Sequence, residues 1–200
     1  MIDTVKIRAR VVSVTDRYHH GDLRRALIDA AVEAVGETGP SALSLRAVAK
    51  RAGVSHAAPA HHFGDKAGLL TAVAAEGFDR FADALERAWT ATGDFDAVGA
   101  AYVRFAIDHR AHFEIMFRPE LLHMDDPDLV RASVRSREAL HRGSGTDGPD
   151  AAFNARALAA WSLAHGFAEL LLAGNFPRAV LDDPEGAFKA VAAATALGRG

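Results

Sequence analysis

The chain has 200 residues, half of them hydrophobic, with 23 Lys and Arg, 26 Asp and Glu, and a formal net charge of -3. This length and composition allow one domain, or two small ones that share a core. The sequence contains no cysteine, which excludes disulfides, thiolate metal sites and cysteine nucleophiles.

The two ends of the chain differ in charge. Residues 1–66 hold 10 Lys and Arg against 7 Asp and Glu, whereas residues 67–200 hold 13 against 19. The basic part favours a polyanionic partner at the N-terminal end. Residues 1–17 lack a continuous apolar run, so we expect a flexible basic arm and not a signal peptide. With no run of 18 apolar residues, we expect a cytoplasmic protein with no membrane partner.

Apolar residues recur at helical spacing almost throughout, which predicts an all-α fold. A first helix is expected over 22–38, capped by Asp22, with an apolar face of Leu23, Leu27, Ala31 and Val35. A second covers 45–52. A third runs from a cap at Ser55 to about His62, after a turn at Gly53 where glycine permits positive φ.

A long fourth helix is predicted over 66–92, because its apolar face continues far beyond what three short helices need: Leu70, Val73, Gly77, Phe81, Leu85 and Trp89. We therefore expect it to belong to two packing units. The expected organisation is an arm over 1–17, a three-helix head over 18–66 and a helical body over 67–200.

Further helices are predicted over 94–109, over 112–117 and from the Asp126-Pro127-Asp128 start, where proline and acids suit a first helical turn. A flexible loop is expected over 143–150, followed by helices over 151–173 and 184–197. The total is about nine helices.

The two short helices around Gly53 have the spacing of a helix-turn-helix, in which the second helix enters the major groove of DNA. This region reads Ser44-Leu45-Arg46-Ala47-Val48-Ala49-Lys50-Arg51-Ala52-Gly53-Val54-Ser55, then His62-Phe63, Lys66 and Leu69-Leu70. On these residues, the segment 18–70 resembles the DNA-binding domain of TetR-family transcriptional regulators.

The rest of the chain matches more loosely. Residues 161–166, Trp-Ser-Leu-Ala-His-Gly, resemble a Trp-x-x-x-His-Gly signature of one C-terminal subgroup. Residues 56–59, His-Ala-Ala-Pro, and residues 18–23, Tyr-His-His-Gly-Asp-Leu, also resemble that subgroup. The resemblance implies a homodimer that binds a palindromic operator on double-stranded DNA, with a pocket for a small-molecule effector in the C-terminal helices.

The resemblance also implies roles for individual residues. Ser44 and Ser55 are expected to bind phosphates, Lys66 to neutralise one, and Arg46 to reach a base edge or a phosphate. The groove floor would be faced by His56, Ala57, Ala58 and His61. Two features depart from the family or from an ordinary helix: Ala60 replaces a tyrosine whose hydroxyl binds phosphate, and Pro59 would be the fourth helical residue if Ser55 is the cap.

The histidines near Gly53 also raise the possibility of a metal site. His56 and His61 are five residues apart and point in different directions on a helix, with no acid to complete a ligand set, so we predict no metal and no cofactor. No phosphate loop, Gly-x-Ser-x-Gly or His-Glu-x-x-His motif occurs, so we expect no enzyme.

The effector pocket is expected to be lined by Tyr102, Phe105, Phe113, Met116, Phe117, Trp161 and His165, although the aromatic residues also suit an ordinary core. His165 is either a core histidine bonded to nearby backbone, which we favour, or part of the pocket wall. With charge limited to His165 and the nearby Arg104 or Arg110, we expect an apolar or amphipathic effector.

Helix 151–173 is apolar almost all round, which predicts burial on several sides. We expect it to form a four-helix dimer interface with the last helix, through Phe153, Ala157, Ala160, Ala164, Phe167, Leu171, Phe188 and Val191. A monomer in which helix 184–197 covers this stripe is the alternative.

The predicted function is that of a dimeric, ligand-responsive repressor. The alternative function, which Ala60 suggests, is that of a small-molecule-binding or protein-interaction module that has lost DNA binding.

Overall fold

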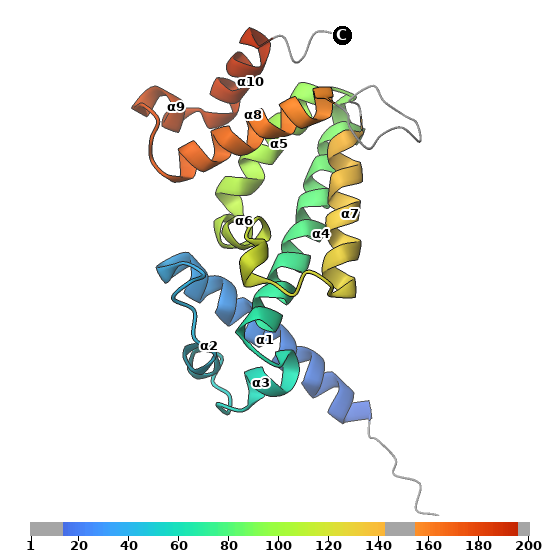
Figure 1. The fold of residues 1–200 in the computed structure, drawn as a ribbon, viewed down its shortest axis with the longest axis vertical. Helices are drawn as coiled ribbons and strands as arrows, with labels where there is room; N and C mark the ends of the chain where they lie inside the picture. The colour runs from blue at the N-terminus through green and yellow to red at the C-terminus, as the bar shows by residue number, and fades with distance from the viewer. Residues whose placement is uncertain (1–13, 143–154, 196–200) are drawn as a thin grey trace, which may run out of the picture.

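The computed structural model describes residues 14–142 and 155–195, with side chains from Leu23 onward. All secondary structure in these residues is helical, as predicted. A head of three helices lies at one end, and the long α4 leads from it into a body that ends in α8 to α10 (Figure 1). The bounds are α1 Val14–Thr38, α2 Leu45–Arg51, α3 Ala58–Phe63, α4 Lys66–Thr92, α5 Phe95–Asp108, α6 Arg110–Met116, the 3-10 turn Pro119–Leu121, α7 Pro127–His141, α8 Ala155–Leu172, α9 Arg178–Asp182 and α10 Pro184–Ala194.

Several boundaries differ from the predicted ones. Helix α1 begins at Val14, so Asp22 lies inside it and its prediction as the cap is wrong. Among the described residues there are ten α-helices where about nine were expected, and the added one is the short α9. The flexible arm was predicted over 1–17, but residues 14–17 belong to α1, so the prediction is wrong for these four residues. Residues 1–13 of the predicted arm, the loop over 143–150 and the start of the helix at 151 lie outside the described residues.

Helix α4 contributes to two hydrophobic cores, as its long apolar face predicted. Leu70 and Val73 pack with buried residues of α1 and α2, whereas Phe81 and Leu85 pack with α5, α6, α8 and α10. The head's core also takes residues from the body: Ala111 and Ile115 of α6, and Leu129 and Ala132 of α7. Head and body are therefore joined by shared packing and not only by the chain.

Helix α6 approaches α4 very closely at Gly77. A Cβ on Gly77 would lie 2.7 Å from the sulfur of Met116 and 3.1 Å from Cβ of His112. Because glycine leaves this space free, α6 can lie across α4 between the two cores.

Helices α4 and α7 run side by side and are joined by ion pairs along one edge (Figure 1). Arg131 donates to both carboxylate oxygens of Asp79, at 3.0 and 2.8 Å. Arg135 donates to Asp83 at 2.6 Å and to Glu86 at 2.8 Å. These contacts fix the edge of α7 that faces α4. Within the described residues, no helix is long and apolar enough to span a bilayer.

Candidate nucleic-acid interface and apolar cavity

The turn between α2 and α3 has the geometry of a helix-turn-helix. Gly53 has φ of 68°, as the turn prediction required, and the amide of Val54 donates to the carbonyl of Ala49 at 3.0 Å. Val48 and Ala49 are fully buried against α1, so α2 is held by its apolar face. The opposite face of α2 is free to meet a partner.

Helix α3 begins later than the sequence predicted. Its first residue is Ala58, and no side chain caps it, so the role of Ser55 as cap is wrong. Pro59 is the second helical residue and not the fourth, and its ring is buried. The reason is that proline fits the first turn of a helix, where an N–H would have no intrahelical partner anyway. Helix α3, which is the expected recognition helix, is therefore only six residues long.

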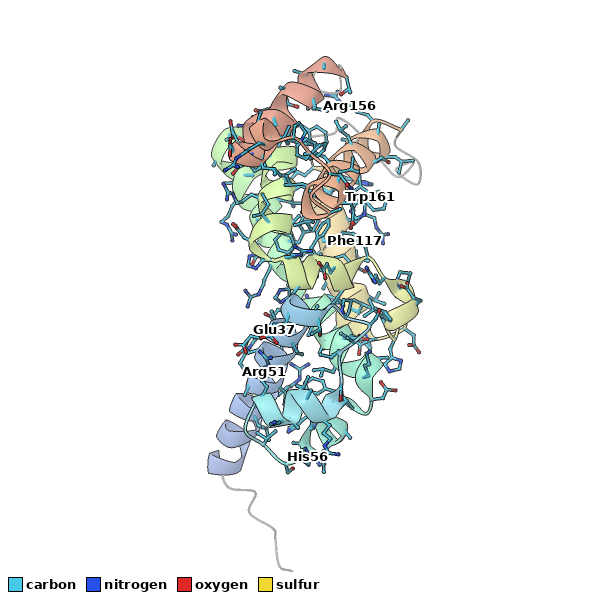
Figure 2. All side chains as sticks on the ribbon, turned by 90° about the vertical axis from the view of Figure 1, so that its left-hand side faces the viewer. Glu37, Arg51, His56, Phe117, Arg156 and Trp161 are labelled. Carbon is cyan, nitrogen blue, oxygen red and sulfur yellow. The ribbon has the colours of Figure 1, made fainter. Side chains whose placement is uncertain are left out.

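Most residues expected to contact DNA are exposed around this short helix. Ser44, Arg46, Ser55, His56, Ala57 and His61 are exposed, whereas Ala58 and Lys66 are half-buried. Figure 2 shows His56 at the free end of the head, away from Phe117 and Trp161. The Lys66 ammonium group donates to the carbonyl of Ser41 at 2.7 Å, which leaves two of its three protons for a phosphate. The DNA contacts themselves stay predictions.

The cations of the head fall into two groups. Arg51 of α2 forms ion pairs with Glu33 and Glu37 of α1. Figure 2 shows Arg51 and Glu37 close to each other. In contrast, Arg46 and Lys50 are exposed and form no ion pair with any described residue. Lys50 was not singled out from the sequence, although the last turn of a helix that crosses a DNA backbone is a suitable place for a phosphate contact.

A tight joint connects α3 to α4. Gly64 has φ of 76° and ψ of -68°, and the amide of Asp65 donates to the carbonyl of Phe63 at 2.9 Å, which makes a three-residue γ-turn. Asp65 then caps α4 by accepting from the amide of Gly68 at 2.8 Å. This bond, together with His123 at 3.0 Å, lowers the pKa of Asp65. Since His123 precedes α7, the body also touches the joint.

A second contact between head and body is a charged cluster around Glu76 of α4. Its carboxylate accepts from Arg25 of α1, pairs with Arg80 at 2.6 Å, and lies 3.4 Å from Nε2 of the buried His112 of α6. Burial raises the pKa of Glu76, but the contacts with His112 and Arg25 outweigh it and hold the pKa at about 2. The charged form of Glu76 is thus part of the packing between three helices.

The body contains a cavity of about 360 Å³ between α4, α6, α7 and α8. Three of the residues expected in an effector pocket line this cavity: Met116, Phe117 and Trp161. Most of the wall was not predicted, and it comes largely from α7. The further lining residues are Phe78, Phe81, Leu122, Met124, Leu129, Val130, Ser133, Ser136, Arg137, Leu140, His141, Ala157 and Leu158.

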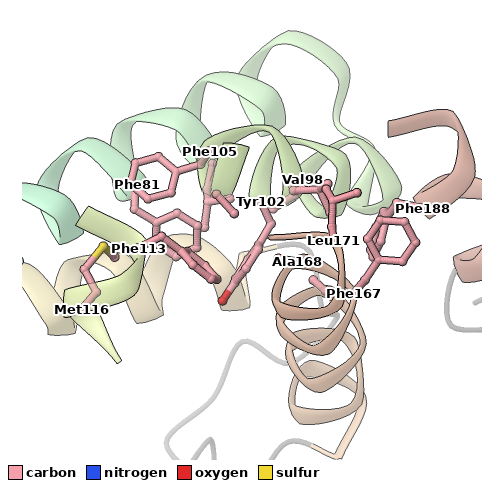
Figure 3. Close-up of a cluster of buried hydrophobic side chains, with 14 of the residues drawn as sticks. Phe81, Val98, Tyr102, Phe105, Phe113, Met116, Phe167, Ala168, Leu171 and Phe188 are labelled. Atoms are coloured by element: carbon pink, nitrogen blue, oxygen red, sulfur yellow. The ribbon is translucent and has the colours of Figure 1, made fainter. Parts of the chain in front are cut away.

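The other predicted pocket residues belong to the body's core. Tyr102, Phe105 and Phe113 are buried among aromatic rings that include Phe81, whose ring centroid is 4.8 Å from that of Tyr102 (Figure 3). They do not line this cavity, and their place in an effector pocket stays a prediction. The aromatic pattern indicated burial but not which rings face empty space.

His165 lies behind the cavity wall. Its Nδ1 is 2.9 Å from the hydroxyl of Tyr102, and its ring centroid is 4.6 Å from that of Phe117. Burial lowers its pKa. His165 is half-buried, and its hydrogen-bond partner is a tyrosine hydroxyl and not backbone. The choice between a core role and a place in the pocket wall stays a prediction. Arg104 and Arg110 are paired with Glu185 and Glu114 and do not line the cavity.

The stripe expected to form the dimer interface is mostly covered within one protomer. Ala164, Phe167, Leu171 and Phe188 are at most 8% exposed and belong to the core shared with α5, so little of their surface is left for a partner to cover. Their place in a dimer interface stays a prediction. Ala157 is also buried, Ala160 is half-buried, and Phe153 lies outside the described residues. Exposed apolar side chains on these helices are Val191, which was predicted, and Leu158, Trp161 and Leu170, which were not.

No group of three or more His, Asp or Glu side chains in the described residues is arranged to hold a metal. The rings of His61 and His62 contact each other at 5.4 Å between centroids. His56 and His61 thus remain exposed side chains of the head.

Both halves of the chain match known protein families. Residues 27–73 match the profile "Bacterial regulatory proteins, tetR family", and residues 95–195 match "Tetracyclin repressor-like, C-terminal domain". The transcriptional regulator BetI of Escherichia coli is 49% identical over 49 residues, and the match covers 24% of this chain and 25% of BetI. The chain thus spans about a quarter of the length of the curated relatives it matches.

Solved structures extend the likeness to the body. A protein of unknown function from Rhodococcus sp. RHA1 is 34% identical, with a TM-score of 0.65 over 86% of this chain and 96% of that one. The putative regulatory protein SCO4313 is 27% identical, with a TM-score of 0.67 over 85% and 95%. The Trp-x-x-x-His-Gly subgroup stays a prediction. The chain belongs to the TetR family of transcriptional regulators.

Proposed function

We propose that the protein is a homodimeric repressor that binds a palindromic operator and is released by a small effector bound in the cavity of the body. The observation that carries this proposal is the position of Leu129. It lines the cavity and is also part of the head's core. A ligand that moves the cavity wall therefore acts on the packing that positions the recognition helix.

Helix α4 supplies the second mechanical link. It begins beside α3 at Lys66 and forms the cavity wall at Phe78, about 18 Å further along the helix axis. Two recognition helices must be spaced at about 34–36 Å to occupy successive major grooves. A tilt of α4 in each protomer changes that spacing. Release follows only if the effector binds the tilted state more tightly than the DNA-bound one.

The dimer is proposed to form through the exposed side of α8 and α10. This side carries Leu158, Leu170 and Val191, each at least 38% exposed, with Ala159 and Ser162 between them. Gly166 adds open space, since a Cβ there would meet nothing within 4 Å. Small residues on such a face allow two helices to approach closely. Sedimentation at micromolar concentration that detects only a 21.2 kDa species would exclude the dimer.

DNA binding is tested by fluorescence anisotropy with duplexes from the intergenic region upstream of the protein's own gene. We expect sequence-dependent binding whose affinity falls steeply with salt, because phosphate contacts release counterions. Arg46→Gln should weaken binding and reduce the salt slope. Arg118→Gln, at an exposed arginine of the body, is the matched control and should change neither.

The alternative is a ligand-binding or protein-interaction module without DNA binding. It is motivated by Ala60, which is exposed on the recognition helix where the family places a phosphate-binding tyrosine. Absence of salt-sensitive, sequence-dependent binding at low ionic strength would favour this alternative over the repressor.

A further inference from the structure

The described residues that line the cavity include basic side chains but no acidic ones. Arg137 and His141 line it, and no Asp or Glu among the described residues does. This is unusual for the molecule, because residues 67–200 carry six more acids than bases. A groove of about 730 Å³ between head and body contains five acids among its lining: Glu76, Asp79, Asp83, Asp126 and Asp128. Among the described residues, the lack of acids is therefore particular to the lining of this cavity.

Arg137 differs from the other arginines of α7. Arg131 and Arg135 face α4 and are paired with its carboxylates. Arg137 faces the cavity instead, is exposed, and has no carboxylate of the described chain within ion-pairing distance. A guanidinium group that no described carboxylate pairs with, at the mouth of an apolar space, can bind a ligand carboxylate through two parallel hydrogen bonds.

The serines of the wall indicate how a ligand would be oriented. Ser133 donates to the carbonyl of Val130 and Ser136 to that of Ser133, each at 2.9 Å. Since their protons are used within α7, these hydroxyls present lone pairs and offer nothing to a deeply placed anion. The remaining wall is mostly apolar, with the aromatic side chains of Phe78, Phe81, Phe117 and Trp161. The charge of a ligand would stay at the mouth.

We propose that the ligand of the cavity is an amphipathic anion, with one carboxylate on Arg137 beside His141 and an apolar chain or ring among Phe78, Phe117 and Trp161. The inference rests on the proposed function, which makes this cavity the effector site. Its volume of about 360 Å³ suits a small molecule, since ligand sites measure roughly 300–1,000 Å³.

The test is calorimetric titration of the 200-residue protein with three ligands that share one tail: octanoate, octanol and octylammonium. We expect octanoate to bind at least about tenfold more tightly than the other two, as one charge-assisted contact implies. Arg137→Gln should abolish this preference while the melting temperature is unchanged. Arg87→Gln, which removes an exposed arginine of α4 outside the cavity, is the matched control and should retain it.

Each other outcome has a distinct meaning. If octanol or octylammonium binds as tightly as octanoate, or if Arg137→Gln keeps the preference, the anionic class is overturned while the cavity remains a ligand site. If none of the three binds, the anionic class and the cavity's role in ligand binding both fail. If octanoate binds with the expected preference but does not release operator DNA, the ligand class stands and the effector role fails.

Discussion

Replacing Gly68 with alanine tests the joint between the recognition helix and α4. A Cβ at this position would lie 2.0 Å from the carbonyl oxygen of Phe63, whereas ordinary contacts are 3.4–4 Å. The two segments must therefore separate by about 1.4 Å, because a backbone oxygen cannot rotate away. Overpacking of this kind costs about 1–3 kcal/mol. The higher helix propensity of alanine offsets ~1 kcal/mol of that, so a net loss of up to about 2 kcal/mol is expected.

The matched control is Gly36→Ala in α1, where a Cβ would meet nothing within 4 Å. We expect this variant to gain about 0.5–1 kcal/mol in the free energy of unfolding in urea, with unchanged DNA affinity. Gly68→Ala should lose stability, and its operator affinity should fall about fivefold for each ~1 kcal/mol needed to restore the position of α3. If the two variants behave alike in both measurements, the close contact with Phe63 does not position the recognition helix.

Three other substitutions test separate parts of the molecule. Ala60→Tyr should tighten operator binding by roughly 0.5–1.5 kcal/mol per half-site, as measured by fluorescence anisotropy. The salt dependence of binding should not change, because a neutral hydroxyl releases no counterion. Unchanged or weaker affinity would show that the family role of this position does not transfer to this protein. Glu76 has a pKa of about 2 in the folded protein against an ordinary value of 4.5. Its ionised form therefore contributes about 3 kcal/mol to the free energy of unfolding, which is present above pH 4.5 and lost as the pH falls toward 2. Glu76→Gln should therefore lower the free energy of unfolding at pH 7 and flatten its decline in that acid window, and a decline as steep as in the parent protein would contradict the ion-pair argument. Tyr102→Phe removes the hydroxyl at 2.9 Å from His165 and should cost about 0.5–1.5 kcal/mol in urea unfolding; no loss would mean that this hydrogen bond is not maintained in solution.

The helix-turn-helix was predictable because its signals are local. Gly53 marks a turn of positive φ, and the apolar positions on either side fix the faces of α2 and α3. The long apolar face of α4 likewise predicted that one helix joins two cores. The start of α3 was missed because Ser55 is an attractive cap, whereas burial of Pro59 and its preference for a first turn determine where the helix begins.

The cavity and the dimer face were less predictable because both depend on how helices are rotated. Helix α8 is apolar almost all round, so periodicity does not tell that Phe167 packs on the protomer's own core while Leu158 and Leu170 are exposed. Much of the cavity wall comes from α7, where Ser133 and Arg137 alternate with apolar residues and suggest an ordinary surface helix. Only the packing of α7 on α4 shows which of its side chains face the cavity.

Selection of bound sequences from random duplexes tests the central claim most directly. Two protomers related by a twofold axis should enrich a palindrome whose half-sites are centred about one helical turn apart, roughly 34–36 Å or a multiple of it. Enrichment of a palindrome with this spacing would establish DNA recognition and dimeric binding together. No enriched sequence, or a single unrepeated half-site, would contradict the account of this chain as a dimeric operator-binding repressor.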